Sequence, residues 1–288
     1  MLHLETLLGD HAVTSALKKG EIASDSVELA FADFQPTHAG FKPMVREGRF
    51  DVSEMAIATY LIAKAHHKPM VLLPAVVMGR FQHEYALCNR SHARLTPADL
   101  AGKRVGIRSF TTTTGAWIRG ILANDYGLDL DRVRWITFEE PHVAEYVDST
   151  ERAPKGKKIL DMLLEGELDA VLGERSEDPR FATLFADPMA EARAWHRRHG
   201  VAPLNHMVVV SKRLVEANPD AVREVFRLLK ASKAKAARPS NGIDFCPFGL
   251  ESLRKPLEAI TLYAAQQKLI PRAYDVEELF DDTTRLLS

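Results

Sequence analysis

The chain has few cysteines, no long apolar run and almost no net charge. Only Cys88 and Cys246 occur among 288 residues, far apart and without metal-site spacing, so a disulfide framework is not expected and a reducing compartment fits. No apolar run approaches the roughly 20 residues that span a bilayer. The net charge of -1 excludes a broad electrostatic attraction to nucleic acid or acidic membranes. Any binding of anions must therefore be local.

Several motifs with a known mechanism are also missing. The chain has no Walker loop, no GxGxxG fingerprint, no GxSxG elbow and no zinc-ligand spacing. The N-terminal stretch MLHLETLLGDH lacks the basic run and apolar segment of a signal peptide. We therefore expect a cytoplasmic protein without nucleic-acid or membrane partners, and no feature calls for a cofactor or a metal.

What is present is an alternation of strands and helices. The length of 288 residues, with 46% hydrophobic and 27% charged residues, is typical of a soluble protein with one large or two medium domains. Short apolar runs predict strands, and segments of helical periodicity predict helices. The predicted strands are 2–8, 27–31, 70–77, 105–107, 133–137 and 170–172. The predicted helices are 14–19, 42–47, 54–65, 116–126, 159–164, 188–199, 219–235, 250–267 and 276–287.

This alternation predicts an α/β fold with two mostly parallel sheets, each covered by helices. Two crossing segments, 81–89 and 206–211, divide the chain into two lobes. Lobe one is expected to contain residues 1–84 plus 207–288, and lobe two residues 85–206. Because ligands of open α/β sheets bind at the carboxyl ends of the strands, we expect a ligand cleft between the lobes.

The stretch 102–127 is the most distinctive in the sequence. Four threonines, Thr111, Thr112, Thr113 and Thr114, precede a predicted helix, and hydroxyl and N–H groups at a helix start form a site for anions. Arg108 and Arg119 flank them, and arginine binds carboxylates with two hydrogen bonds. A threonine-capped helix with surface arginines is the structural alternative, and we expect Arg119 on that surface. Trp117 is expected in the core.

A family resemblance rests on stretches spread over nearly the whole chain. They are FDVSEM (50–55), GRFQHEYALCNR (79–90), DLAGKRVGI with WIRGILANDYG (99–127), LLEGELDAVL (163–172), ATLFADP (182–188), GVAPLNHMVVV (200–210), EANPDAV (216–222) and PFGLESLRKPLE (247–258). Together they resemble the 4,5-dihydroxyphthalate decarboxylase family, whose fold is that of the type II periplasmic binding proteins.

Two segments differ from the family pattern. The chain has Gly9-Asp10-His11-Ala12 where the family usually has Tyr-Asp-Arg-Thr. It has Arg108-Ser109-Phe110 where a Pro-Glu-Tyr-like sequence is usual. Both segments lie at the expected cleft, so they bear on the substrate more than on the fold.

The resemblance implies a carboxy-lyase that acts on a hydroxylated aromatic dicarboxylate. Such a reaction must hold a carboxylate, protonate the ring carbon that bears it, and relieve the ring's charge through a hydroxyl. The hydroxylated ring delocalises the charge itself, so no cofactor is needed. We expect His83 and His206 as proton donors and Glu54 as a base.

Substrate-binding residues are expected where loops follow the predicted strands. Each has a structural alternative: Ser53 and Glu54 start and cap a helix, Asp10 forms a turn, and each histidine makes a structural hydrogen bond. The candidates are Asp10, His11, Ser53, Arg80, Arg108, Thr111, Thr112, Thr113 and Thr114.

Other functions remain open at this stage. One is a substrate-binding protein of the ABC-transporter type, which binds a small aromatic anion without catalysis. Another is a different lyase on the same scaffold, such as a dehydratase of a cyclic enol acid. In each case the partner is a small aromatic or cyclic carboxylate. The terminal helices offer an interface for a homo-oligomer.

Overall fold

The computed structural model describes residues 1–91, 95–237 and 242–288. They form two compact units: the first contains residues 1–80, 202–259 and 273–288, and the second contains 81–201 and 260–272. We expected lobes of 1–84 plus 207–288 and of 85–206, so the main difference is segment 260–272. That segment packs in the second unit because Gln267 is hydrogen-bonded to Arg119 and to the carbonyl of Ala116. Within the described ranges, no helix combines the length and apolar content needed to cross a membrane.

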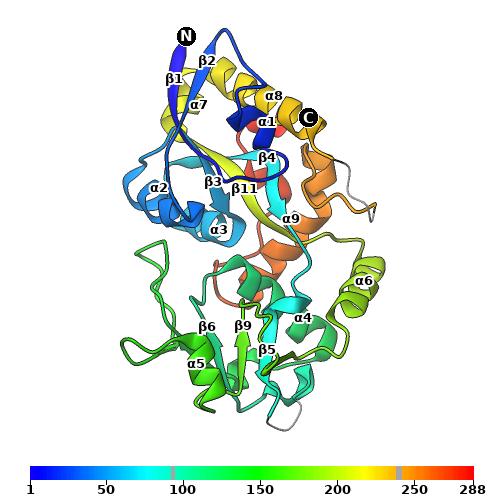
Figure 1. Ribbon diagram of the computed structural model, residues 1–288. Helices are drawn as coiled ribbons and strands as arrows, with labels where there is room; N and C mark the ends of the chain where they lie inside the picture. Colours follow the sequence, from blue (N-terminus) through cyan, green and yellow to red (C-terminus); the bar gives the residue numbers. More distant parts are fainter. Residues whose placement is uncertain (92–94, 238–241) are drawn as a thin grey trace. The chain divides into compact units, whose positions relative to one another are not determined.

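The first unit is built on a five-stranded mixed sheet in the order β2–β1–β3–β11–β4 (Figure 1). Neighbours β2, β1 and β3 are parallel, whereas β11 is antiparallel to both β3 and β4. Strand β4 therefore runs in the same direction as β1–β3, as expected for a mostly parallel sheet, but the antiparallel β11 lies between β3 and β4. The strands are β1 (Leu2–Leu7), β2 (Val27–Phe31), β3 (Val52–Ala56), β4 (Met70–Gly79) and β11 (Leu204–Ser211).

Helices cover this sheet. The long helix α8 places Val225 and Phe226 against Val208 and Val210 of β11, in a core cluster that also includes Leu17 of α1. The helices of this unit are α1 (Ser15–Lys18), α2 (Phe41–Glu47), α3 (Ile57–Ala65), α7 (Lys212–Ala217), α8 (Pro219–Lys235) and the first part of α9 (Leu250–Gln266), with 3₁₀ turns η1 (Thr37–Gly40), η5 (Val276–Leu279) and η6 (Thr284–Leu286).

The prediction of a terminal helix over 276–287 is wrong, because the structure has two short 3₁₀ turns there. Asp275 caps η5 in a reciprocal capping box with Glu278. The carboxylate of Asp281 then accepts hydrogen bonds from the N–H groups of Thr283 and Thr284. Each aspartate starts a new short turn, so the helical periodicity of this segment does not become one helix.

The second unit contains a six-stranded mixed sheet in the order β10–β5–β9–β6–β7–β8. Its β9, β6, β7 and β8 are parallel neighbours, and β5 is antiparallel to β9 and β10. The strands are β5 (Ala86–Asn89), β6 (Arg104–Ile107), β7 (Arg134–Thr137), β8 (Glu151–Arg152), β9 (Ala170–Leu172) and β10 (Phe181–Thr183). The helices are α4 (Thr113–Tyr126), α5 (Ile159–Leu164) and α6 (Pro188–His199), with 3₁₀ turns η2 (His83–Tyr85), η3 (Pro97–Leu100) and η4 (Leu130–Arg132).

Arg119 lies inside the second unit, and our prediction of a surface arginine is wrong. Its side chain is fully buried, and the guanidinium carbon lies 3.8 Å from the ring centroid of Phe110. It donates hydrogen bonds to the Phe110 carbonyl (2.6 Å) and to Oε1 of Gln267 (2.8 Å). Burial lowers the pKa of Arg119 to about 9. The guanidinium therefore links α4 to two other segments of this unit. Trp117, predicted in the core, is also fully buried.

Gly120 of α4 lies against the ring of Tyr263 in α9. A Cβ atom at Gly120 would lie 2.1 Å from Cδ2 of that ring. We expect Gly120→Ala to destabilise the second unit by about 1–3 kcal/mol through overpacking, although alanine favours helices by roughly 1 kcal/mol. All tryptophans of the chain lie within 117–195, so urea unfolding followed by tryptophan fluorescence measures this loss.

The control is Gly120→Ala in a Tyr263→Ala background. Without the ring, the added methyl group should cost nothing or stabilise the helix. An equal loss in both backgrounds would exclude the ring contact as the cause.

His83 is a second buried polar residue of this unit. It is 1% exposed, and its ring centroid lies 4.9 Å from Phe185 and 6.4 Å from Trp195. Among the described residues, neither ring nitrogen has a hydrogen-bond partner. Burial lowers the pKa of His83 from 6.5 to about 4. The folded unit therefore holds this imidazole in its neutral form at neutral pH.

This pKa predicts a loss of stability in acid. Between pH 6.5 and 4 the unfolded chain binds a proton at His83 that the folded unit does not, so the free energy of unfolding falls as the pH falls through this window. The contribution of His83 is about 3 kcal/mol, lost between neutral pH and pH 4. We expect His83→Leu to remove this part of the pH dependence, measured by urea unfolding at several pH values. Identical pH dependence in wild type and variant would contradict the prediction.

Candidate active site

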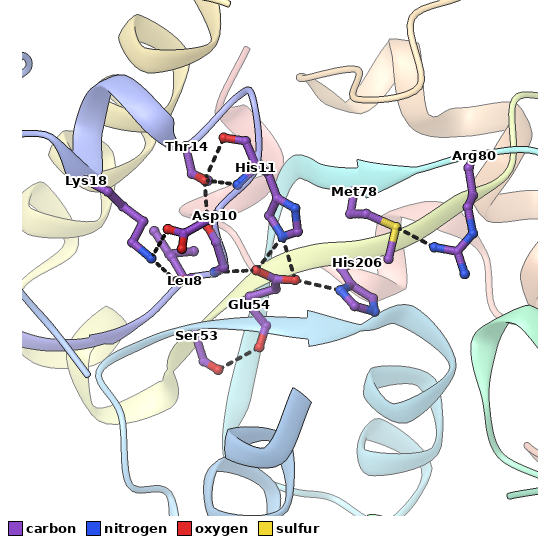
Figure 2. A network of polar contacts seen from close by, with 11 residues as sticks. Leu8, Asp10, His11, Thr14, Lys18, Ser53, Glu54, Met78, Arg80 and His206 are labelled. Carbon is purple, nitrogen blue, oxygen red and sulfur yellow. Dashed lines mark hydrogen bonds and ion pairs between the residues drawn. The ribbon is translucent and has the colours of Figure 1, made fainter. Parts of the chain in front are cut away.

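Glu54 of β3 is the centre of a polar cluster in the first unit. Its side chain is 1% exposed, and three groups donate hydrogen bonds to its carboxylate (Figure 2). The donors are the N–H of Gly9 (2.7 Å), Nε2 of His11 (2.9 Å) and Nδ1 of His206 (2.6 Å). Three residues that the sequence predicted for separate roles in catalysis and binding therefore lie in direct contact. We call His11, Glu54 and His206 the trio.

The sheet register explains this contact. In the antiparallel pair of β3 and β11, Glu54 lies opposite Val208, and His206 lies two residues before Val208 on β11. Residues at such diagonal positions share one face of the sheet, and long side chains can span the distance. The pairing of β11 with β4 is irregular on both sides of His206, and such bulges redirect a side chain. The ladder thus brings a residue of the returning chain onto Glu54.

The turn after β1 supplies the other two donors. Leu7 of β1 lies opposite Ser53 of the parallel strand β3, so the chain just beyond β1 passes beside Glu54. The hydroxyl of Thr14 donates to the Gly9 carbonyl (2.7 Å) and accepts from the His11 N–H (3.0 Å), which fixes the turn. A Cβ atom at Gly9 would lie 2.7 Å from Nε2 of His11 and 2.9 Å from Oε2 of Glu54. Glycine is therefore needed for this close approach.

The trio fixes a negative charge in a buried position. Burial alone raises the pKa of Glu54, but the hydrogen bonds and charges of His11 and His206 outweigh it and hold the pKa well below its usual range. An ionised carboxylate only accepts hydrogen bonds, so Nε2 of His11 and Nδ1 of His206 each carry the hydrogen that faces it. This arrangement suits Glu54 for orienting two imidazoles better than for removing a proton.

The predicted helix start at Ser53 and Glu54 is wrong. Strand β3 continues to Ala56, and α3 begins only at Ile57. Pairing with β11 overrides the local helical pattern, so neither side chain caps a helix. Ser53 is fully buried, and its hydroxyl donates to the carbonyl of Glu54 (2.7 Å).

Two further candidates of the first unit have other contacts. The side chain of Asp10 is exposed and forms an ion pair with Lys18, which lowers the pKa of Asp10. Figure 2 shows this carboxylate directed toward Lys18 and away from Glu54. Nη1 of Arg80 lies 3.1 Å from Sδ of Met78. Their predicted roles in binding a substrate stay predictions.

The remaining candidates belong to the second unit. Arg108 follows β6, with its Nε 3.7 Å from Oε2 of Glu139. The hydroxyl of Thr111 lies 3.0 Å from that of Ser109, and Thr112 precedes α4 without a side-chain capping bond. Thr113 and Thr114 begin α4 and are buried, as is His83. The predicted carboxylate site at the threonines stays a prediction.

Sequence reasoning missed the role of Gly9, and it left a divalent metal at Glu54, His83 or His206 open without including His11. The three side chains come from segments that are 43 and 152 residues apart, so no ligand spacing is visible in the sequence. Their ligand atoms nevertheless lie within 4.8 Å of one another. The one local signal was the Gly-Asp-His turn after the first strand.

Comparisons with known proteins give the following. No family model matches the chain. The 4,5-dihydroxyphthalate decarboxylase of Comamonas testosteroni is 27% identical over 251 residues, which cover 82% of this chain and 76% of the relative. The 4,5-dihydroxyphthalate decarboxylase of Pseudomonas putida is 28% identical over 212 residues, which cover 68% of this chain and 82% of the relative.

A solved structure gives the fold. The alkanesulfonate-binding protein SsuA from Xanthomonas axonopodis pv. citri, bound to MOPS, aligns with a TM-score of 0.58 at 14% identity and covers 97% of both chains. At this identity the likeness concerns the fold alone. The resemblance predicted from the sequence is confirmed: over most of its length the chain is similar to 4,5-dihydroxyphthalate decarboxylases, on a periplasmic-binding-protein-like fold.

Proposed function

We propose that the protein is a carboxy-lyase that removes CO₂ from a hydroxylated aromatic dicarboxylate such as 4,5-dihydroxyphthalate. Two relatives that align over most of the chain carry the name of this activity. The two cysteines are free thiols, which suits the reducing cytoplasm that we propose as its location.

The observation that carries the proposal is the trio around Glu54. Because Nδ1 of His206 donates to the carboxylate at 2.6 Å, Nε2 is the ring nitrogen left to exchange a proton. The side chains of His11 and His206 are 24% and 19% exposed, so a bound molecule can reach both imidazoles while Glu54 stays buried. A buried carboxylate that fixes the tautomer of an accessible imidazole is typical of general acid–base catalysis.

The substrate chemistry matches two imidazoles. In 4,5-dihydroxyphthalate each ring carbon that bears a carboxylate has a hydroxyl para to it. When a base takes the hydroxyl proton, electron density moves to that carbon, which accepts a proton from an acid. The C–C bond then breaks, its electron pair restores the aromatic ring, CO₂ leaves, and the base returns its proton to the oxygen. The net reaction consumes one proton, which ends on the ring carbon.

We assign the proton transfers to His206 and His11, and an orienting role to Glu54. The low pKa of Glu54 makes it a weak base for a phenol, whereas imidazole exchanges protons near neutral pH. In this assignment Glu54 acts through the histidines and does not touch the substrate. This replaces the expectation from sequence that Glu54 itself is the base.

The function is tested by incubating the purified protein with 4,5-dihydroxyphthalate. We expect release of CO₂ together with 3,4-dihydroxybenzoate, measured by mass spectrometry. Binding of the compound without turnover would favour a binding protein without catalysis. If the compound is neither bound nor turned over, the substrate is a different one.

The site is tested by His206→Ala. We expect kcat to fall by about 10²–10⁴-fold, the usual contribution of general acid–base catalysis, while KM changes little. The matched control is His3→Ala, which removes an exposed imidazole of the same unit that pairs with Glu28. An unchanged kcat in His206→Ala would remove this residue from the mechanism.

A further inference from the structure

We propose that the trio is a binding site for one divalent transition-metal ion, ligated by Nε2 of His11, the carboxylate of Glu54 and Nδ1 of His206. These ligand atoms all lie within 4.8 Å of one another. Two imidazoles and one carboxylate are ligands that zinc and iron accept in proteins, in sites that keep further coordination positions open. The inference concerns binding by the protein alone and does not depend on the proposed decarboxylation, whose proton transfers are assigned to the metal-free trio.

The distances within the trio fit such a site. Ligands about 2.1 Å from a metal and at right angles to each other are about 3.0 Å apart, and at a tetrahedral angle about 3.4 Å apart. Nε2 of His11 lies 2.9 Å from each carboxylate oxygen, and Nδ1 of His206 lies 2.6 Å from Oε1. The two nitrogens lie within 4.8 Å of each other, so an ion beside the carboxylate would draw the two imidazoles together.

The ion would occupy the space that now holds the hydrogens between the two imidazoles and the carboxylate of Glu54. One hydrogen now lies between each imidazole and the carboxylate, and a metal ion would take the place of both. Each imidazole then carries its hydrogen on the other ring nitrogen, Nδ1 in His11 and Nε2 in His206. The charges balance well, because a divalent cation meets a buried carboxylate and two neutral ligands.

The surroundings orient the ligands and leave a route for entry. The Gly9 N–H donates to Oε2 of Glu54 at 2.7 Å, and the ring of Phe41 packs edge-on against His206 at 5.3 Å. Such outer contacts fix ligand geometry in metal sites. The partial exposure of both imidazoles, 24% and 19%, gives an ion access from solvent.

The competing interpretation is that the histidines only stabilise a buried carboxylate. Hydrogen-bond donation alone can be supplied by arginine, which cannot bind a metal because its guanidinium has no free lone pair. His11→Arg therefore separates the two interpretations. It keeps donors beside Glu54 in a partly exposed position and removes one ligand.

The experiment measures Zn²⁺ binding by isothermal titration calorimetry after removal of metals with EDTA. We expect one Zn²⁺ per wild-type chain, with affinity at least 100-fold lower in both His11→Arg and His206→Gln. Titration with Co²⁺ provides a second readout, because its visible absorption bands report nitrogen and oxygen ligands. Circular dichroism establishes that each variant is folded, and His11→Arg carries the test if His206→Gln is not.

Two controls address adventitious binding. His3→Ala removes an exposed imidazole of the first unit, and His199→Ala removes one that pairs with Asp125 in the second. Both should bind Zn²⁺ as the wild type does. Absence of stoichiometric binding to the wild type, or undiminished binding by folded His11→Arg, would overturn the proposal.

Discussion

The buried charge of Glu54 is the constraint on which the first unit depends. An ionised carboxylate with 1% exposure costs several kcal/mol unless its oxygens are fully hydrogen-bonded. Gly9, His11 and His206 meet this need from two separate segments of the chain. Strands β1, β3 and β11 must therefore reach one particular register together, because a shift of one residue would turn Glu54 or His206 to the other face. The same requirement that stabilises the sheet assembles the candidate active site.

Local signals were enough to predict much of the fold. The bounds of α5, α6 and α8 agree with the predicted ranges 159–164, 188–199 and 219–235. Two of these helices have proline at the first position after Asp187 or Asn218, which marks a helix start in the sequence itself. The predictions fail where pairing with a segment far away in the sequence determines the secondary structure or the strand order. Residues 54–56 have a helical pattern but pair with β11, and the same late strand lies between β3 and β4 in the sheet.

The residues of the candidate site could be predicted from the sequence, but their contacts could not. His11, Glu54 and His206 could each be selected from the sequence, because imidazole and carboxylate groups next to strand ends are typical of catalytic sites. Their mutual contact could not be predicted, since it depends on a diagonal pairing across 152 residues. Arg119 was misassigned for a related reason. A cation on a helix is usually solvated, and only the distant Phe110 carbonyl and Gln267 explain its burial.

The position of β11 between β3 and β4 has a consequence for biosynthesis. When a ribosome has released residues 1–80, β3 and β4 have emerged, but they are not neighbours in the finished sheet. The strand that separates them, and His206 with it, is translated only after the segment 81–201. The nascent N-terminal segment must therefore keep two unpaired strand edges and a partly satisfied Glu54 until β11 inserts. Such edges are open to wrong partners, so vectorial synthesis exposes this part of the chain to mispairing until β11 is made.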